Sequence, residues 1–328
     1  MTEQNSFNII NQPTDWDEHD KQHLPNLLPQ LEKSRSIADA RRLDRSAERF
    51  KPSQALINAM NAALAARVPL LLTGEPGTGK TQVAWFIRRF LKIKLYEYQV
   101  HSNSQASDMR YDFDAVAYLR DAYQTQAGNS EQPPETSGAD QRSNDKYLKK
   151  RALWQAYEDP NECVLLFDEI DKAPRDFPND LLQELDQHEF AHPFEDRKVK
   201  RTGPPPITII TSNGERRLPD AFLRRCIVHH IELTPELLKK IMQAWSTSFP
   251  NLRDEATKEI ALERFLQVRE LDKLSKQPGA AELILWLTVL SAQNIKVEQI
   301  SEDVPLAQLP AKECLIKDHN DYKHLEKV

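Results

Sequence analysis

Apolar residues follow two different spacings along this chain. Short apolar runs at 70–73, 95–100, 163–167, 207–211 and 227–233 predict buried β-strands, and helical spacing of apolar residues separates most of them. Buried strands that alternate with helices predict an α/β fold, a parallel sheet covered by helices on both faces. After Leu233 the strand pattern ends, and helical spacing at 254–275 and 280–293 predicts a small helical domain.

Two further helices are predicted from local signals for a helix start or a helix end. Ser53 is a predicted N-cap for a helix that carries Leu56, Ile57, Met60, Ala63 and Leu64 at helical spacing and that ends before Pro69. Thr234 followed by Pro235 is typical of a helix start and predicts the first helix of the C-terminal domain.

Two stretches are polar and lack this patterning. Residues 1–49 are mostly polar and charged, and 125–145 are rich in Ser, Gly, Pro, Gln and Asp, which predicts a disordered surface insertion. The predicted organisation is therefore a polar extension (1–49), an α/β core (50–233) interrupted at about 125–145, and a helical domain (234–328).

Composition narrows the class of protein. Length (328 residues) agrees with about two domains of roughly 150 residues each. The net charge of −6 offers no basic face for wrapping DNA, although it leaves room for a narrow basic pore. No apolar run is long enough to span a bilayer, the N-terminus does not resemble a secretory signal, and Cys163, Cys226 and Cys314 suit a reducing cytoplasm.

A glycine-rich loop follows the first predicted strand. GEPGTGKT matches G-x-x-x-x-G-K-[ST] between a strand and a helix, the context in which this pattern binds phosphate. Backbone N–H groups and the helix N-terminus would surround the phosphates, Lys80 would neutralise the β- and γ-phosphates, and the Thr81 hydroxyl would bind Mg²⁺. The predicted ATP-binding residues are Gly74, Glu75, Pro76, Gly77, Thr78, Gly79, Lys80 and Thr81.

Two adjacent acids end the predicted strand 163–167. Asp168 would face the Mg²⁺ held by Thr81, and Glu169 would point elsewhere, because successive strand residues alternate, and would polarise the attacking water. The alternative is a pair of solvated carboxylates at a strand exit.

Two further polar groups fit a hydrolase. Asn213 follows the strand 207–211 and could hold the attacking water, or it could only cap or turn the chain. Arg224 and Arg225 could reach the γ-phosphate of a neighbouring subunit, or they could be the basic end of a helix next to its negative dipole.

These motifs in this order resemble the AAA+ ATPases, and in particular the MoxR family. GEPGTGKT resembles the Walker A motif, VLLFDEIDKAP the Walker B motif, and TSNGERRLPDAFLRRC sensor 1 followed by the arginine-finger segment; the similarity covers about residues 50–328. The resemblance implies a five-stranded αβα core with a helical lid, a homo-oligomeric ring that is usually hexameric, and Arg225 as the finger with Arg224 supporting it.

The resemblance also implies a partner. Members commonly remodel another protein, often one with a von Willebrand factor A domain. One departure is Ala281, which stands where many lids carry a sensor 2 arginine. Either the lid reports the nucleotide state without this arginine, or a nearby cation such as Lys276 substitutes for it. His229 and His230 are interpreted as structural, and Trp286 and Leu287 as core residues.

Other functions stay open at this stage. A nucleic-acid motor of a restriction or defence system would need a basic pore, which Arg197, Lys198, Lys200 and Arg201 could line. A nucleotide-dependent scaffold would bind ATP without hydrolysing it, but the intact pair Asp168–Glu169 argues against that.

Overall fold

The computed structural model describes residues 50–127, 145–252, 254–271 and 274–325. They form two compact units. One unit comprises Pro52–Gly74 and Lys80–Ile231; the other contains Glu75–Gly79 and the chain from Glu232 on. The predicted extension (1–49) and most of the polar insertion lie outside the described residues.

A parallel sheet lies at the centre of the first unit. Its strands are β1 (Leu70–Gly74), β2 (Lys94–Gln99), β5 (Cys163–Asp168), β8 (Ile207–Ser212) and β9 (Ile227–Ile231). They lie side by side in the order β2-β5-β8-β1-β9, and every neighbouring pair is parallel. The predicted α/β class and all five predicted strands are confirmed.

Strand register decides which residues meet at the carboxyl edge of the sheet. Gln99 pairs with Asp168, and Phe167 pairs with Ile210, so Asp168 stands level with Thr211 on the next strand. Because parallel strands end at the same edge, the residues that end β1, β2, β5 and β8 meet there, where open α/β sheets bind their ligands.

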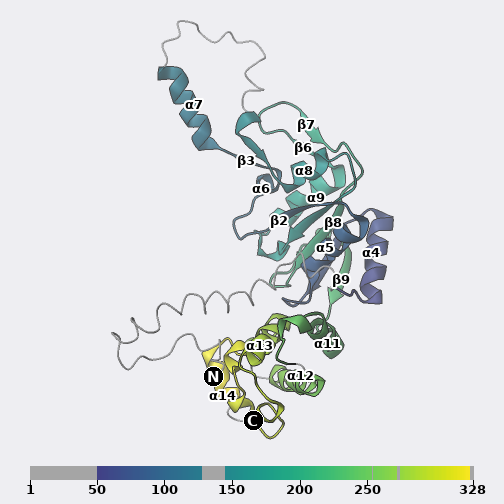
Figure 1. The fold of residues 1–328 in the computed structure, drawn as a ribbon. Helices are drawn as coiled ribbons and strands as arrows, with labels where there is room; N and C mark the ends of the chain where they lie inside the picture. The colour runs from purple at the N-terminus through teal and green to yellow at the C-terminus, as the bar shows by residue number, and fades with distance from the viewer. Residues whose placement is uncertain (1–49, 128–144, 253, 272–273, 326–328) are drawn as a thin grey trace. The chain divides into compact units, whose positions relative to one another are not determined.

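Helices cover both faces of this sheet (Figure 1). They are α4 (Gln54–Ala66), α5 (Lys80–Leu91), α8 (Ala152–Glu158), α9 (Phe177–Gln187) and α10 (Asp220–Leu223). Cys163, Leu165 and Phe167 share a buried cluster with α8 and α9, whereas Val164 and Leu166 point to the other face. All five are fully buried, because a strand between two helical layers has no polar side.

The start of α4 follows the sequence prediction. The Ser53 hydroxyl accepts a hydrogen bond from the Leu56 N–H at 3.2 Å, and the helix ends before Arg67, which adopts the left-handed conformation. Leu56, Met60 and Ala63 are its buried residues, whereas Ile57 is half-buried and Leu64 is exposed. The apolar spacing therefore marks most of the face that packs on the sheet.

Two small antiparallel pairs extend the first unit. The first joins β3 (Tyr111–Phe113) to β4 (Leu148–Lys150), next to α6 (Ala106–Arg110); the second joins β6 (Glu189–Ala191) to β7 (Lys198–Lys200). Between β3 and β4, α7 (Ala115–Ala127) projects from the rest of the unit (Figure 1). The polar insertion was predicted from residue 125, but α7 continues to Ala127 before the chain leaves the described residues.

The second unit is helical. Its helices are α11 (Pro235–Ala244), α12 (Glu255–Arg269), α13 (Ala280–Ala292) and α14 (Tyr322–Leu325), with single 3₁₀ turns at Ser246–Ser248, Val297–Gln299, Leu306–Gln308, Lys312–Cys314 and His319–Asp321. The Thr234 hydroxyl caps α11 as predicted, by accepting from the Leu237 N–H. Trp286 and Leu287 are fully buried, which confirms them as core residues. None of the described helices is long and apolar enough to cross a bilayer.

Candidate active site

The glycine-rich loop leaves β1 through a backbone that only glycine adopts easily. Gly74, Gly77 and Gly79 have φ of 142°, 82° and 89°. A Cβ on Gly74 would lie 2.4 Å from the Ile231 carbonyl oxygen, so a side chain there would collide with the backbone of β9. Lys80 begins α5, and its buried ammonium donates to the Gly74 carbonyl at 2.8 Å. The lysine therefore lies back over the end of β1.

The residues of the loop itself are held by one contact within the loop and by contacts from a distant part of the chain. The Thr78 hydroxyl donates to the Glu75 carbonyl at 2.8 Å. In the same unit, Arg269 forms an ion pair with Glu75 (2.6 Å) and donates to the Pro278 carbonyl (2.7 Å). A Cβ on Gly77 would lie 3.0 Å from the backbone nitrogen of Ala281, so the residue at the sensor 2 place lies against the loop.

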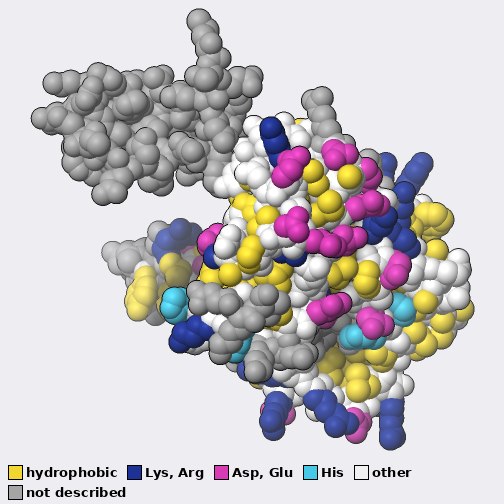
Figure 2. All heavy atoms as spheres, turned by 90° about the horizontal axis from the view of Figure 1, so that it is seen from below, with side chains coloured by type: hydrophobic (Ala, Val, Ile, Leu, Met, Phe, Trp, Pro, Cys, Tyr) yellow, Lys and Arg dark blue, Asp and Glu magenta, His cyan; other side chains and the backbone are white. Residues whose placement is uncertain are grey.

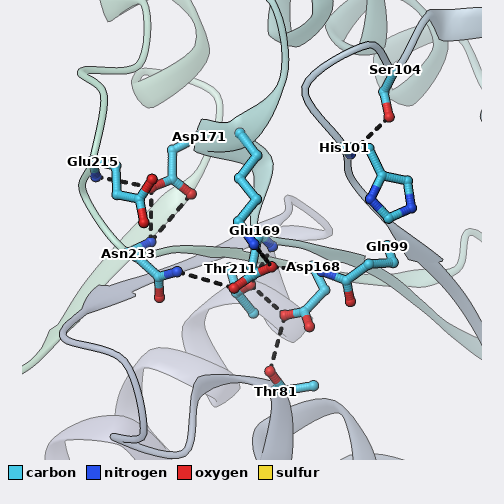
Figure 3. A network of polar contacts seen from close by, with 11 residues as sticks. Thr81, Gln99, His101, Ser104, Asp168, Glu169, Asp171, Thr211, Asn213 and Glu215 are labelled. Carbon is cyan, nitrogen blue, oxygen red and sulfur yellow. Dashed lines mark hydrogen bonds and ion pairs between the residues drawn. The ribbon is translucent and has the colours of Figure 1, made fainter. Parts of the chain in front are cut away.

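Asp168 accepts two hydroxyl donors on the same oxygen. Thr81 Oγ1 donates to Asp168 Oδ1 at 2.9 Å, and Thr211 Oγ1 donates to it at 2.6 Å (Figure 3). Asp168 Oδ2 has no hydrogen-bond partner among the described residues. The predicted meeting of Thr81 with Asp168 is present, with one carboxylate oxygen left for a ligand.

Glu169 follows in a strained backbone conformation. Its φ and ψ are 60° and 51°, the left-handed region that non-glycine residues rarely occupy. Its carboxylate accepts three donors: Asn213 Nδ2 on Oε1 (3.1 Å), and Gln99 Nε2 (2.8 Å) and Lys172 Nζ (2.5 Å) on Oε2. The hydrogen bond to Glu169 raises the pKa of Lys172. A strained residue whose side chain is held by several groups is typical of an active site.

This turn explains how two adjacent acids avoid each other. The sequence suggested that strand alternation separates Asp168 from Glu169. The strand ends at Asp168, and the left-handed residue Glu169 starts the 3₁₀ turn Ile170–Lys172, so the change of backbone conformation at Glu169 separates the carboxylates.

Asp171 ties the end of β8 to this turn. Its buried carboxylate accepts from the Asn213 N–H (3.1 and 3.2 Å) and from the Glu215 N–H (2.9 Å) (Figure 3). Asn213 is thus fixed through its backbone while its amide reaches Glu169.

The predicted arginines lie apart from the acidic cluster. Arg225 forms an ion pair with Asp186 (2.9 Å) and donates to the Ala221 carbonyl, and both charged side chains are about half exposed. Within the described residues, neither Arg224 nor Arg225 hydrogen-bonds to Asp168 or Glu169. His230 Nδ1 lies 3.0 Å from the Thr73 hydroxyl, in keeping with a structural role.

Comparison with protein-family models gives one match. Residues 69–226 match the AAA domain of the dynein-related subfamily. The matched segment contains β1, β2, β5 and β8, the lysine Lys80, both acids and Asn213. The AAA domain match agrees with the AAA+ resemblance, but it does not single out the MoxR family.

Solved structures resemble the chain only distantly. NtrX from Brucella abortus in complex with ADP has a TM-score of 0.48 at 13% identity over 97% of this chain and 69% of that chain. NtrX in complex with ATP has a TM-score of 0.39 at 14% identity over 92% and 65%. A putative ATPase from Cytophaga hutchinsonii has a TM-score of 0.39 at 15% identity over 92% and 98%. No curated protein matches the chain.

Several residues that contact the predicted motif residues were not picked out from sequence. They are Gln99, Thr211, Asp171 and Lys172 in the acidic cluster, and Arg269 beside Glu75. Gln99 and Thr211 end or lie near the end of strands, and strand register is the signal that could have paired them with Asp168. Arg269 carries no such signal, because only folding brings it to Glu75 from almost two hundred residues away.

Proposed function

We propose that this chain is a Mg²⁺-dependent ATP hydrolase of the AAA+ MoxR type that forms a homo-oligomeric ring and remodels a protein partner. The observation that carries the proposal is the meeting of Thr81, Asp168, Glu169 and Asn213 at one edge of the sheet, next to a buried Lys80. We place the activity in the cytoplasm, where its free cysteines Cys163, Cys226 and Cys314 would stay reduced.

The donor set fits Mg²⁺, which prefers oxygen ligands. Thr81 Oγ1 and Asp168 Oδ1 lie 2.9 Å apart, and Asp168 offers a second oxygen. When bound, Mg²⁺ neutralises charge on the phosphates. Lys80 supplies a positive charge at the same place, and the N–H groups of the glycine-rich loop and of the start of α5 are suited to phosphate oxygens.

Glu169 is suited to be the general base for water. Its three donors leave acceptor capacity on Oε1, the oxygen that Asn213 also contacts. A water bound to Oε1 would lie within reach of the Asn213 amide, so one group accepts the proton and the other orients the oxygen.

Phosphate release from ATP by the full chain tests the reaction. Lys80→Ala should remove nucleotide binding and phosphate release, because it deletes the buried ammonium group that lies at the Gly74 carbonyl, where the loop begins. Lys94→Ala is the matched control, since Lys94 is two-thirds exposed and lies at the opposite end of the sheet. Release that survives Lys80→Ala would show that another site, or a contaminant, hydrolyses the ATP.

A ring would let Arg225 act on a neighbour. Its ion pair with Asp186 is half exposed and worth about 0–1 kcal/mol, so the arginine can leave it at little cost. Lys80→Ala and Arg225→Ala chains should each be inactive and should recover activity when mixed, because one pocket in the mixed ring keeps both residues. No recovery in assemblies of the same mass would place the arginine outside the neighbour's pocket.

The apolar face of α7 supports a protein partner. Val116, Leu119 and Tyr123 follow helical spacing and are 79%, 52% and 69% exposed. An isolated helix of 13 residues is marginal in water, so a surface that covers these three exposed side chains would stabilise it. A von Willebrand factor A domain protein is the partner class that the resemblance implies. Its stimulation of hydrolysis should be lost in Val116→Ser/Leu119→Ser.

The nucleic-acid alternative loses support at the β6–β7 hairpin. Glu189 pairs with both Lys198 and Lys200, and Glu195 pairs with Arg197. Figure 2 shows the molecule from below, where Asp and Glu side chains lie among the Lys and Arg side chains. Retention of DNA or RNA that falls steeply with salt would reinstate this alternative.

A further inference from the structure

One buried hydroxyl contacts both acids of the site. Thr211 lies on β8, has no exposed surface, and donates to Asp168 Oδ1 at 2.6 Å. The Thr211 hydroxyl oxygen also accepts a hydrogen bond from the backbone N–H of Glu169 at 2.8 Å (Figure 3). A threonine hydroxyl has one proton and two lone pairs, so it can make both contacts at once.

Each of these two hydrogen bonds fixes a different part of the acidic pair. The left-handed conformation takes the Glu169 N–H out of the strand pairing, and a buried N–H without a partner is costly. The bond from Thr211 uses one oxygen of Asp168 and leaves Oδ2 without a partner among the described residues. The hydroxyl therefore fixes the direction of the Asp168 carboxylate and the turn that carries the Glu169 carboxylate.

We propose that Thr211 is a positioning residue that couples the metal-side carboxylate Asp168 to the general base Glu169. This role of Thr211 rests on the ATP hydrolysis proposed above. Thr211 touches neither water nor phosphate in this proposal; it acts through the two acids. Strand register makes the arrangement possible, because Phe167 pairs with Ile210 and the next residues stand level.

Two substitutions separate the hydroxyl from the shape of the side chain. Thr211→Val is nearly isosteric and lacks the hydroxyl, whereas Thr211→Ser keeps the hydroxyl and loses a methyl group. Thr208→Val is the matched control: Thr208 is a buried threonine of the same strand, and its hydroxyl donates to the Pro206 carbonyl at the other end.

The first measurement needs no turnover. A fluorescent ATP analogue is titrated on the full chain at increasing Mg²⁺, and the Mg²⁺ concentration at half-maximal binding is recorded. Thr211→Val should raise this concentration about tenfold, as loss of a partner of a metal ligand does. Thr211→Ser and Thr208→Val should stay close to the wild type.

The second measurement is hydrolysis. Thr211→Val should lower kcat by about 10- to 100-fold with little change in the KM for ATP, and Thr211→Ser should recover most of kcat. If Thr211→Val does not fold, Thr211→Ala takes its place, since it removes the hydroxyl without a second methyl group.

The outcomes separate this proposal from the proposed function. An unchanged Mg²⁺ dependence in Thr211→Val, an equal loss in Thr211→Ser, or an equal loss in Thr208→Val would each overturn the role of the hydroxyl. A wild-type chain that binds the analogue with Mg²⁺ but releases no phosphate would refute the hydrolase, while the binding titration would still decide the role of Thr211 toward Asp168.

Discussion

Each end of the central sheet holds a buried carboxylate, Asp159 at the amino end and Asp168 at the carboxyl end. The two carboxylates differ in how many of their oxygens have a hydrogen-bond partner. At the amino end, Asp159 accepts from Lys94 Nζ (2.9 Å) and the Tyr96 hydroxyl (2.8 Å) on one oxygen, and from the N–H and amide of Asn161 on the other. At the carboxyl end, Asp168 keeps one oxygen without a described partner, and its neighbour Glu169 sits in a strained turn.

The difference separates a carboxylate whose two oxygens both have partners from the carboxylate of the proposed active site. The partners of Asp159 fill both its oxygens and lower its pKa to about 2, chiefly through the hydrogen bond from Lys94. The carboxyl end uses its contacts to aim groups at a place where a ligand can bind, at a cost in backbone strain. Substitutions at the carboxyl end of the sheet should therefore affect activity, and substitutions at the amino end should affect stability.

The largest expected effect is that of Glu169→Gln. The amide cannot accept a proton from water, so kcat should fall by about 10³-fold while nucleotide binding and the melting temperature stay close to the wild type. Phosphate release, a binding titration and a thermal melt measure the three quantities. Turnover that persists at the wild-type rate would remove Glu169 from the role of base.

Asn213→Ala should come next. Loss of the amide that contacts Glu169 Oε1 should lower kcat by about 10²-fold, because a group that orients reacting atoms is lost. Asn161→Ala is the control, since it removes an asparagine amide from the carboxylate at the other end. Equal losses of kcat in both variants would indicate general damage to the sheet.

Asp159→Asn should lower stability and leave activity unchanged, the opposite of the two substitutions above. It leaves the donors of Lys94 and Tyr96 facing an amide, so the free energy of unfolding should fall by about 1–3 kcal/mol with kcat unchanged where the protein is folded. Denaturant unfolding measures the difference. Lys94→Met should cost less, about 0–1 kcal/mol, because the lysine is two-thirds exposed. A large loss of kcat in Asp159→Asn would abolish the contrast between the two ends.

The last expected effect depends on pH. The folded pKa of Asp159, about 2, lies below its ordinary value of 3.8, so its stabilisation is present above pH 4 and is lost as the pH falls toward 2. The difference in unfolding free energy between wild type and Asp159→Asn should shrink over that range by roughly 1–2 kcal/mol, a figure reduced for the exposure of Lys94. A difference that stays constant from pH 5 to pH 2 would contradict the lowered pKa.

Sequence patterns predicted the strands of the central sheet and the motif residues of the candidate site. Apolar runs predicted all five strands of the sheet, Ser53 and Thr234 predicted two helix starts, and GEPGTGKT with Asp168 and Glu169 predicted a phosphate and metal site. These signals are local, since apolar spacing, capping residues and glycine backbone freedom can be read from residues close in the chain.

The positions of these groups in space depended on contacts between distant segments. Thr81 and Asp168 are 87 residues apart, and their meeting could be expected from the parallel sheet; the Thr211 hydroxyl between Asp168 and Glu169, and the bonds from Gln99 and Lys172, could not. Their presence follows from strand register and from the left-handed turn at Glu169, both set by packing of the whole sheet. The chain alone therefore predicted the motif residues of the candidate site, and the tertiary structure added their partners and decided how they are aimed. A hydrogen bond forms only when donor and acceptor lie about 3 Å apart, to within a few tenths of an ångström, and no local pattern encodes that distance.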